Sequence, residues 1–372
     1  MKIMFLCGGL EPGSDGVGDY TRLLSIELIK LGHQIHIVAL NDSFITDTNK
    51  SIQRSKGIEV EVLRMPSVLS IEKKSEIVKN WVNDLNPDWI SLQYVPFSFH
   101  SKGIPFGLSK ALNRLGKGRK WNIMFHELWV GLDNEATPKM ILWGHIQRLL
   151  IRKLVQVLQP KIIHTHTKVY QAILQKNGFE AKYLPLFSNI PVNNEPNSGV
   201  KKDSVKENNF IRLVIFGSLH PEAPVGNFAD EVVNYSNKYK TQITLTFIGR
   251  SSNQQAVWEA IWTEKGLTFE NLGEGTPEYI SSALSNCSIG ISTTPISLIE
   301  KSGAVAAMRE HGLPVICVAR PLTPRGIKNT NVPLDVLEYK KGNLELLLAE
   351  RFGILSEYKN AEDVSKQLLR DF

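Results

Sequence analysis

Cysteine, long apolar runs and blocks of like charge are all scarce in this sequence, and each scarcity excludes a class of protein. The three cysteines, Cys7, Cys287 and Cys317, have neither the spacing of a disulfide framework nor that of a metal site. No apolar run approaches the roughly 18 residues that a membrane span needs. The apolar start of the chain, residues 1–9, is too short for a signal peptide and is interpreted as a first strand.

No long run of lysine or arginine and no basic segment interleaved with aromatic residues is present, which argues against nucleic acid as a partner. The formal net charge of +6 is compatible with an anionic ligand or an anionic membrane surface. A hydrophobic share of 42% and a charged share of 22% are typical of a folded globular chain, and 372 residues exceed one ordinary core. We therefore expect a cytoplasmic protein of two domains.

The first half of the chain predicts a parallel α/β domain. A strand over Lys2–Cys7 is followed by a glycine-rich loop over Gly8–Gly18, a helix over Tyr20–Leu31 and a second strand over Gln34–Leu40. A long helix is expected over Met140–Leu158. Further strands are expected at Glu59–Arg64, Trp89–Tyr94, Asn122–Phe125 and Lys161–His166.

The second half repeats this pattern after a polar segment. Residues 189–209 are rich in Asn, Pro, Lys, Ser and Glu, which predicts an interdomain linker. We thus predict a first domain over residues 1–188, a second over 210–354, and a C-terminal segment over 355–372 whose helix, Ala361–Leu369, packs back on the first domain. The strands expected in the second domain are Phe210–Phe216, Ile243–Ile248, Thr268–Leu272, Ser288–Ser292 and Pro314–Val318.

The segment from Thr294 to Val318 is the most informative in the chain. A polar loop containing Ser302 and Gly303 leads into an alanine-rich helix, Gly312 ends that helix, and an apolar strand follows. The amides and the dipole at the start of such a helix favour an anion. The sequence therefore predicts a ligand that carries phosphate.

In their order and spacing, several segments resemble the GT-B glycosyltransferases, and within them the large retaining group called family 4. The matching segments are Gly16-Val-Gly-Asp-Tyr20 with Gly32-His-Gln-Ile-His-Ile37, His126-Glu127, Phe216-Gly-Ser-Leu-His-Pro-Glu222, Phe247-Ile-Gly-Arg250, and the stretch from Glu300 to Val315. The resemblance covers nearly the whole chain. It implies two Rossmann-like domains facing each other across a cleft, and transfer of a sugar from a nucleotide-sugar donor on the second domain to a glycan or lipid-linked acceptor on the first. It implies no metal and no cofactor besides the donor, and a role in building a surface polysaccharide or glycolipid.

Carried onto this sequence, the resemblance makes His126 and Glu300 the catalytic candidates, with His126 beside the reacting sugar and Glu300 on its hydroxyls. The aromatic stretch from Gln93 to His100 follows a buried strand, so Gln93 and Tyr94, together with Glu127, are acceptor-side candidates. Each candidate also has a purely structural interpretation as a turn, a helix cap or a solvated charge. The donor-side candidates are Gly16, Val17, Gly18, Ser218, His220, Arg250, Lys301, Ser302, Gly303 and Ala304.

The sequence departs from the family pattern at the donor site. The family usually has two glutamates eight residues apart, of which Glu300 matches the first; the second would fall at Met308, or at Ala307 if one residue is deleted, and neither is acidic. The arginine and lysine that normally follow the first strand of the donor domain are replaced by Ser218 and Ala223. The nearby cations available in their place are His220, Arg250, Lys301 and Arg309. These departures motivate a second hypothesis, a catalytically silent GT-B subunit that binds a sugar nucleotide or a partner enzyme.

Three segments of the chain each permit more than one interpretation. Asp42 ends the second strand where a ribose-binding acid often lies, as in a Rossmann oxidoreductase. His164 and His166 share a strand face and form either a metal pair or, as we favour, a polar strand end. The helix over Met140–Leu158 pairs apolar residues with Arg148, Arg152 and Lys153, so its apolar face belongs either to the core or to peripheral contact with the inner face of a membrane.

Overall fold

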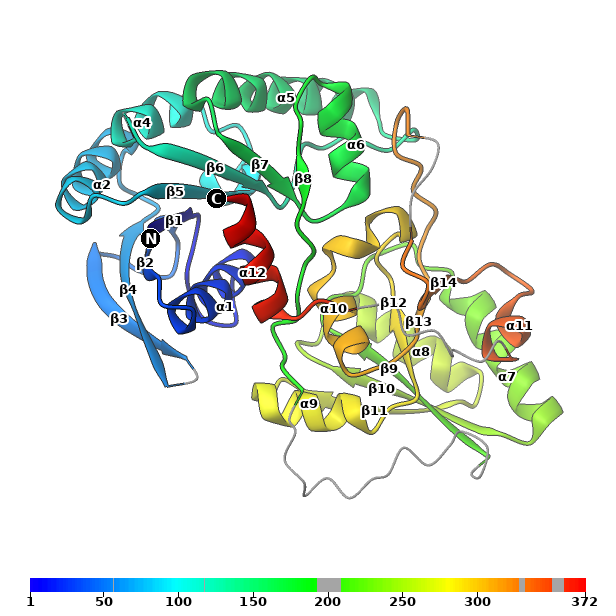
Figure 1. Ribbon diagram of the computed structural model, residues 1–372. Helices are drawn as coiled ribbons and strands as arrows, with labels where there is room; N and C mark the ends of the chain where they lie inside the picture. Colours follow the sequence, from blue (N-terminus) through cyan, green and yellow to red (C-terminus); the bar gives the residue numbers. More distant parts are fainter. Residues whose placement is uncertain (56, 117, 193–208, 328–331, 350–357) are drawn as a thin grey trace. The chain divides into compact units, whose positions relative to one another are not determined.

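The computed structural model describes residues 1–55, 57–116, 118–192, 209–327, 332–349 and 358–372 (Figure 1). The chain divides into two compact units. Unit 1 comprises Met1–Pro185, Thr323–Asn329 and Ala361–Phe372, and unit 2 comprises Leu186–Leu322 and Thr330–Asn360. Most of the expected linker, residues 193–208, and the expected boundary at 354/355 lie outside the described residues.

Unit 1 is built on a sheet with the strand order β3-β4-β2-β1-β5-β6-β7-β8. Neighbouring strands are parallel except β3 and β4, which are antiparallel. The central strands are continuous buried runs because helices cover both faces of a parallel sheet. The strands are β1 (Lys2–Cys7), β2 (Gln34–Asp42), β3 (Asn49–Ser55), β4 (Ile58–Pro66), β5 (Trp89–Tyr94), β6 (Lys120–Phe125), β7 (Ile162–Thr165) and β8 (Lys182–Tyr183).

Helices α1 (Gly16–Lys30) and α12 (Ala361–Asp371) lie side by side on one face of this sheet, and α2 (Ile71–Leu85), α4 (Leu108–Leu115) and α5 (Pro138–Leu158) cover the other (Figure 1). The short α3 (Pro96–Phe99) follows β5, and α6 (Lys168–Lys176) follows β7. The C-terminal helix thus packs on the first helix of the chain, within unit 1. Phe372, which follows this helix, stacks on Trp89 of β5 with ring centroids 4.2 Å apart.

Helix α1 begins four residues earlier than the sequence predicted. Asp15 is its N-cap, and the Asp15 carboxylate accepts a hydrogen bond from the Gly18 amide at 2.8 Å. Gly16, Val17 and Gly18 therefore form the first helical turn and not the end of a loop. Gly18 is required where α1 approaches the backbone that follows β1, because a Cβ on Gly18 would lie only 2.8 Å from the Gly9 carbonyl oxygen.

Helix α5 divides its apolar residues between the core and the surface. A stripe of residues 144, 147, 151, 154 and 158 is buried, as the core interpretation predicted. Leu142 and Leu149 remain exposed, at 66% and 49% of their surface, and Met140 and Ile141 of the same helix are exposed as well. Among the described residues, no helix combines the length and the apolar character that crossing a bilayer requires.

Unit 2 contains a parallel sheet with the strand order β11-β10-β9-β12-β13-β14. Together with unit 1 it confirms the predicted α/β class with two parallel-sheet domains. Phe228, Trp258 and Trp262 form the centre of its core beside β9 and β10. Its strands are β9 (Phe210–Phe216), β10 (Gln242–Ile248), β11 (Thr268–Gly273), β12 (Ile289–Ser292), β13 (Val315–Cys317) and β14 (Val336–Glu338). Its helices are α7 (Val225–Tyr239), α8 (Asn253–Glu264), α9 (Pro277–Ser285), the 3₁₀ helix η1 (Ile296–Lys301), α10 (Gly303–Glu310) and α11 (Leu344–Ala349).

Candidate functional site

A chain of buried polar side chains crosses three neighbouring strands of unit 1, on the face that α1 covers. The His126 ring, directly after β6, contacts Gln93 Oε1 through Nε2 at 2.9 Å and His166 Nε2 through Nδ1 at 2.8 Å. His166 Nδ1 lies 3.1 Å from the Leu184 carbonyl oxygen. On the other side, Gln93 Nε2 donates to Ser91 Oγ at 2.9 Å. The Tyr20 ring of α1 meets both imidazoles edge-on at 5.1 Å.

The chain continues across β6 to α12. Ser91 Oγ donates to Asn122 Oδ1 at 2.7 Å, and Asn122 Nδ2 lies 3.2 Å from the Ile162 carbonyl oxygen and 2.9 Å from His164 Nδ1. Because a carbonyl only accepts, the amide nitrogen of Asn122 must face Ile162, and His164 Nδ1 must then accept. The proton of His164 is therefore on Nε2, which donates to Asp371 at 2.9 Å. This half of the chain is fully satisfied with a neutral His164.

The His126 half has one hydrogen too few. Five hydrogen-bond contacts join six groups in a line. In order, the groups are the Leu184 carbonyl, His166, His126, Gln93, Ser91 and Asn122 Oδ1. Neutral side chains supply four hydrogens: one from each imidazole, one from the Gln93 amide and one from the Ser91 hydroxyl. Turning the Gln93 amide moves the gap without closing it. Only one extra proton on the histidine pair completes every contact.

Burial opposes that proton. It lowers the pKa of His126 well below its ordinary value, and His166 adds to the effect because a positive charge on one ring disfavours the other. Burial likewise lowers the pKa of His166 to about 4. At neutral pH the pair is therefore uncharged and one of the five contacts has no hydrogen. An anion brought near the pair would raise both pKa values and favour the completed network.

This network fixes what the predicted residues on β5 and β6 can do. Both ring nitrogens of His126 are engaged inside unit 1, so a ligand reaches this residue through its backbone unless the network opens. Gln93 and Tyr94 are each only 1% exposed, so their side chains belong to the interior and not to an acceptor surface. Glu127 is partly exposed. The four ring nitrogens of His164 and His166 all have hydrogen-bond partners within the protein, which supports the polar strand end over a metal pair.

The two helix starts predicted to receive a diphosphate differ in charge. At α1, the Asp15 carboxylate already occupies the position beside the first amides; burial raises its pKa, and hydrogen bonds from the amides of Gly18, Val17 and Gly9 offset only part of that rise. At α10, the N-cap is the neutral hydroxyl of Ser302, which accepts from the Val305 amide at 3.3 Å, and no acidic residue lies in the first turn. The remaining first-turn amides of a helix have no intrahelical acceptor. The start of α10 is thus the better anion site of the two.

The carboxyl ends of β9 and β10 meet the start of α10. A Cβ on Gly217, which follows β9 with φ +79°, would lie 3.5 Å from Ala304 Cβ. A Cβ on Gly249, after β10 with φ +119°, would lie 3.4 Å from the Gly217 backbone. Both glycines adopt a backbone conformation that disfavours other residues. Ser218, which follows Gly217, is exposed beside this junction.

Basic side chains gather at the same end of the sheet. Partial desolvation lowers the pKa of His220, and the positive charges of Lys301 and Arg320 lower it further. Arg320 Nε also lies 3.5 Å from the exposed carboxylate of Glu222. The His220 amide donates to Thr293 Oγ1 at 2.7 Å, which ties this loop to the end of β12. Sequence reasoning missed Arg320, although its position three residues after β13 is itself a signal, since ligands bind beyond the carboxyl ends of parallel strands.

Two of the cations predicted from the sequence are engaged elsewhere. The exposed Arg250 guanidinium pairs with Glu274 at 3.1 Å. Arg309 pairs with the buried Asp335 at 2.7 Å. Met308, where the family pattern has its second glutamate, is fully buried, and a Cβ on Gly290 of β12 would lie only 2.5 Å from its Sδ. The Met308 side chain therefore packs helix α10 against the sheet. Glu300, in η1, is partly buried.

No family model matches the chain, and no curated protein matches it. Solved structures do match it along its whole length. A glycosyltransferase from Rickettsia africae ESF-5 superposes with a TM-score of 0.56 at 12% identity, over 100% of this chain and 92% of the other. The catalytic domain of starch synthase IV from Arabidopsis thaliana, bound to ADP and acarbose, gives 0.55 at 11%, over 100% and 98%. A UDP-GlcNAc 2-epimerase from Neisseria meningitidis, bound to UDP-GlcNAc, gives 0.56 at 12%, over 100% and 99%.

At this identity the likeness concerns the fold. The chain has the GT-B fold that the sequence resemblance implied, with two parallel-sheet α/β domains. Transferases and epimerases both occur among its structural neighbours. The activity of this chain must therefore be argued from its own residues.

Proposed function

We propose that this protein is a glycosyltransferase that moves a sugar from a nucleotide-sugar donor to a glycan or lipid-linked acceptor, without a metal ion and with retention at the anomeric carbon. The observation that carries the proposal is the start of α10, where a neutral Ser302 cap lies beside glycine-lined strand ends. Lys301 directly precedes that cap, and His220 and Arg320 lie on the loops that follow β9 and β13 at the same edge of the sheet. This is the arrangement expected for a diphosphate held by amides and cations.

In the proposed reaction, the bond between the anomeric carbon and the diphosphate oxygen breaks, and negative charge develops on the departing diphosphate. The acceptor oxygen bonds to the anomeric carbon, and its proton passes to the departing diphosphate oxygen. Amides of Gly303 and Ala304, with Lys301, His220 and Arg320, would stabilise that charge without rearranging. Arg320 and Lys301 would thereby take the place of the arginine and lysine that the family pattern has at Ser218 and Ala223.

The remaining roles follow the family resemblance. Glu300 would hydrogen-bond hydroxyl groups of the donor sugar, and Gly16 and His126 would approach the sugar through their backbone. Gly16 suits this role because it lies at the start of α1 and a Cβ there would meet nothing within 4 Å. The structural neighbours that bind ADP or UDP-GlcNAc support a nucleotide-sugar ligand.

We further propose peripheral contact with an anionic membrane through α5. Its exposed Met140, Ile141, Leu142 and Leu149 accompany the exposed Arg152 and Lys153. An apolar surface with basic neighbours lowers its free energy at the interface of an anionic bilayer. A lipid-linked acceptor would then be presented at that surface.

Two further functions would use the same donor site. A nucleotide-sugar epimerase is suggested by the epimerase neighbours, and a silent binding subunit is suggested by Met308. The oxidoreductase hypothesis is less favoured, because Asp42 is fully buried and its carboxylate already binds Arg64 at 2.8 Å and the amides of Leu10 and Phe44. That carboxylate has no place for a ribose.

A nucleotide-sugar panel separates these functions. Purified protein would be incubated with UDP-, ADP-, GDP- and dTDP-sugars, with and without oligosaccharide and lipid-phosphate acceptors, and the products followed by NMR. Acceptor-dependent release of nucleotide, lost in Glu300→Ala, supports the transferase. An epimerised sugar without acceptor would assign the epimerase instead. Binding with no turnover of any sugar would assign the silent subunit.

A further inference from the structure

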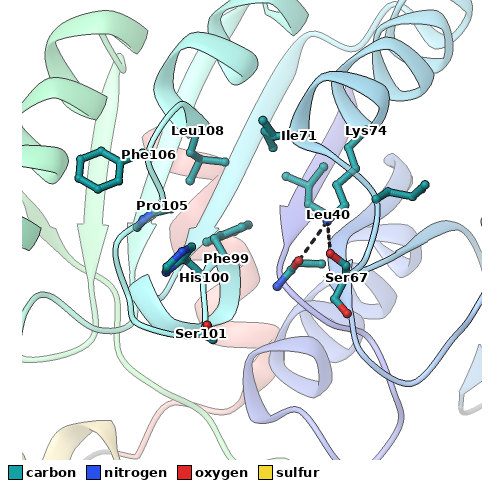
Figure 2. A pocket seen from close by; sticks show the side chains of 12 residues that line it. Leu40, Ser67, Ile71, Lys74, Phe99, His100, Ser101, Pro105, Phe106 and Leu108 are labelled. Atoms are coloured by element: carbon teal, nitrogen blue, oxygen red, sulfur yellow. Dashed lines mark hydrogen bonds between the residues drawn. The ribbon is translucent and has the colours of Figure 1, made fainter.

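A pocket of about 380 Å³ lies within unit 1, beyond the carboxyl ends of β2 and β4 (Figure 2). Its volume is in the range of small-ligand sites, and its place in the sheet is where ligands of parallel sheets bind. The candidate site described above does not include it. Its lining residues are Leu40, Asn41, Ser67, Leu69, Ile71, Lys74, Phe99, His100, Ser101, Pro105, Phe106 and Leu108.

The charge in this pocket is unbalanced. Lys74 points from α2 toward the ends of β2 and β4, and its Nζ donates to Asn41 Oδ1 at 3.0 Å and to the Ser67 carbonyl oxygen at 3.3 Å (Figure 2). The side chain is only 4% exposed. Within the part of the chain that the structure describes, no carboxylate lies within ion-pair distance of it. An ammonium group has three hydrogens, so one remains for a ligand.

A buried cation whose only partners are neutral is costly, and an anion bound beside it removes that cost. Burial lowers the pKa of Lys74, in keeping with an uncompensated charge. The neighbouring carboxylate of Asp42 does not help, because it is directed to Arg64 on the next strand. The pocket therefore favours a ligand that brings its own negative charge.

A second donor stands on the opposite wall. His100 Nδ1 accepts the amides of Lys102 at 3.1 Å and Ile104 at 3.4 Å, so the ring hydrogen is on Nε2. No described residue accepts from that Nε2. The rings of Phe99 and Phe106 and the side chain of Leu108 line the same wall (Figure 2). Aromatic and aliphatic groups beside polar donors suit the apolar face and the hydroxyl edge of a sugar ring.

We propose that this pocket binds an acidic sugar, one that carries a phosphate or a carboxylate, with the acidic group on Lys74 and the sugar ring against Phe99, His100 and Phe106. Under the proposed function, on which this assignment of role rests, the acidic sugar is the acceptor. The stretch after β5 that the sequence marked as an acceptor shelf contributes its far end, Phe99 and His100, and not its first residues, Gln93 and Tyr94.

The test measures binding by calorimetry with no nucleotide present. The probes are glucose 6-phosphate, glucuronate, glucose, and vesicles of phosphatidylglycerol. Lys74→Met keeps the apolar stem and removes the charge, Lys74→Arg keeps the charge, and Lys73→Met removes an exposed lysine from the same helix as a matched control. Far-UV circular dichroism and thermal unfolding establish that each variant is folded.

We expect at least one acidic sugar to bind at least tenfold more tightly than glucose, Lys74→Met to abolish that preference, and Lys74→Arg and Lys73→Met to retain it. Vesicle binding that depends on Lys74, without binding of the soluble acids, would keep the acidic group and assign it to a lipid. Equal binding of glucose and the acids, or equal loss in Lys73→Met, would overturn the proposal. Because no donor is present, a failed transfer assay with intact acid binding contradicts only the proposed function.

Discussion

His126 Nδ1 and His166 Nε2 lie 2.8 Å apart in the interior of unit 1, joined to a carbonyl on one side and an amide on the other. Both outer partners present oxygen, so the pair binds its surroundings completely only with an added proton. Burial removes that proton at neutral pH. The conflict between hydrogen bonding and desolvation makes the stability of unit 1 depend on the protonation of this pair.

The first prediction concerns stability against pH. The folded-state pKa of His166, about 4, lies below the 6.5 of an exposed histidine, so the unfolded chain binds the proton first. The free energy of unfolding should be at its full value above pH 6.5 and fall by about 3 kcal/mol between pH 6.5 and pH 4, with His126 adding to the loss. Urea unfolding monitored by tryptophan fluorescence across this range measures it.

The control is His166→Gln, which should be less stable at pH 7 by about 1–3 kcal/mol, because it disrupts two buried hydrogen bonds, and should show a shallower slope below pH 6.5. Stability of the parent protein that stays level from pH 6.5 to 4 would contradict the lowered pKa values of the pair, because it requires the folded chain to bind as many protons as the unfolded chain over this range.

The second prediction separates packing from ligand approach at the start of α1. Gly18→Ala should lower the free energy of unfolding by about 1–3 kcal/mol, because the new Cβ meets the Gly9 carbonyl and Leu10 Cα at 2.8 and 3.1 Å. Gly16→Ala should leave stability unchanged or raise it by up to ~1 kcal/mol, since nothing lies within 4 Å of its Cβ. We expect Gly16→Ala nonetheless to lower kcat/KM about tenfold, the loss of ~1.4 kcal/mol of transition-state binding. Unchanged kinetics in a stable Gly16→Ala protein would remove Gly16 from the donor site.

The third prediction concerns the diphosphate. Arg320→Met and Lys301→Met should each weaken binding of the nucleoside diphosphate about tenfold, the loss of one charge-assisted contact. Arg250→Met is the matched control: both arginines pair with a glutamate, but the Arg250 side chain is 76% exposed and that of Arg320 only 35%, so the affinity of Arg250→Met should change less than twofold. Isothermal calorimetry decides. If Arg250→Met weakens binding and Arg320→Met does not, the cation assignment is reversed.

The fourth prediction concerns α5. Leu142→Glu places a charge on the exposed apolar side of the helix and should reduce co-sedimentation with phosphatidylglycerol vesicles at least fivefold, through lost apolar burial and added repulsion. Val257→Glu, on the exposed side of α8 in unit 2, is the control and should sediment like the parent. Equal effects of the two substitutions would show that net charge, and not α5, governs the interaction.

The sequence predicted the central strands best, because an apolar run covered on both faces has a signal of its own. β1, β5 and β9 match their expected bounds, and β10 differs by one residue. The edges were missed: β3 is rich in Asn, Lys, Gln and Arg and is defined only by its pairing with β4, and β14 has three residues. Helix α1 was begun too late because the glycines were assigned to a loop and Asp15 was not identified as its cap.

The candidate site was less accessible to sequence reasoning, because partners across strands are set by register. Ser91 and Asn122 are unremarkable polar residues until β5, β6 and β7 are aligned, and His166 was assigned to a polar strand end without its partner His126. Lys74 looks like its neighbour Lys73 in a helical pattern, and only the packing of α2 on the sheet buries one and exposes the other. The start of α10 was found in advance because its signal is local: a small polar cap, a glycine and an alanine-rich helix.

Helix α12 gives the molecule a particular order of assembly. Asp371 receives the hydrogen of the buried His164 and pairs with Lys182 at 2.5 Å, so a residue that follows unit 2 in the sequence completes a network whose other members were made some 180 to 280 residues earlier. The ribosome must therefore synthesise all of unit 2 before α12 is available to complete the fold of unit 1. Until then, the nascent chain has neither Asp371 as the partner of His164 nor Phe372 stacked on Trp89. An incompletely folded unit 1 can be recognised by chaperones and proteases during this interval.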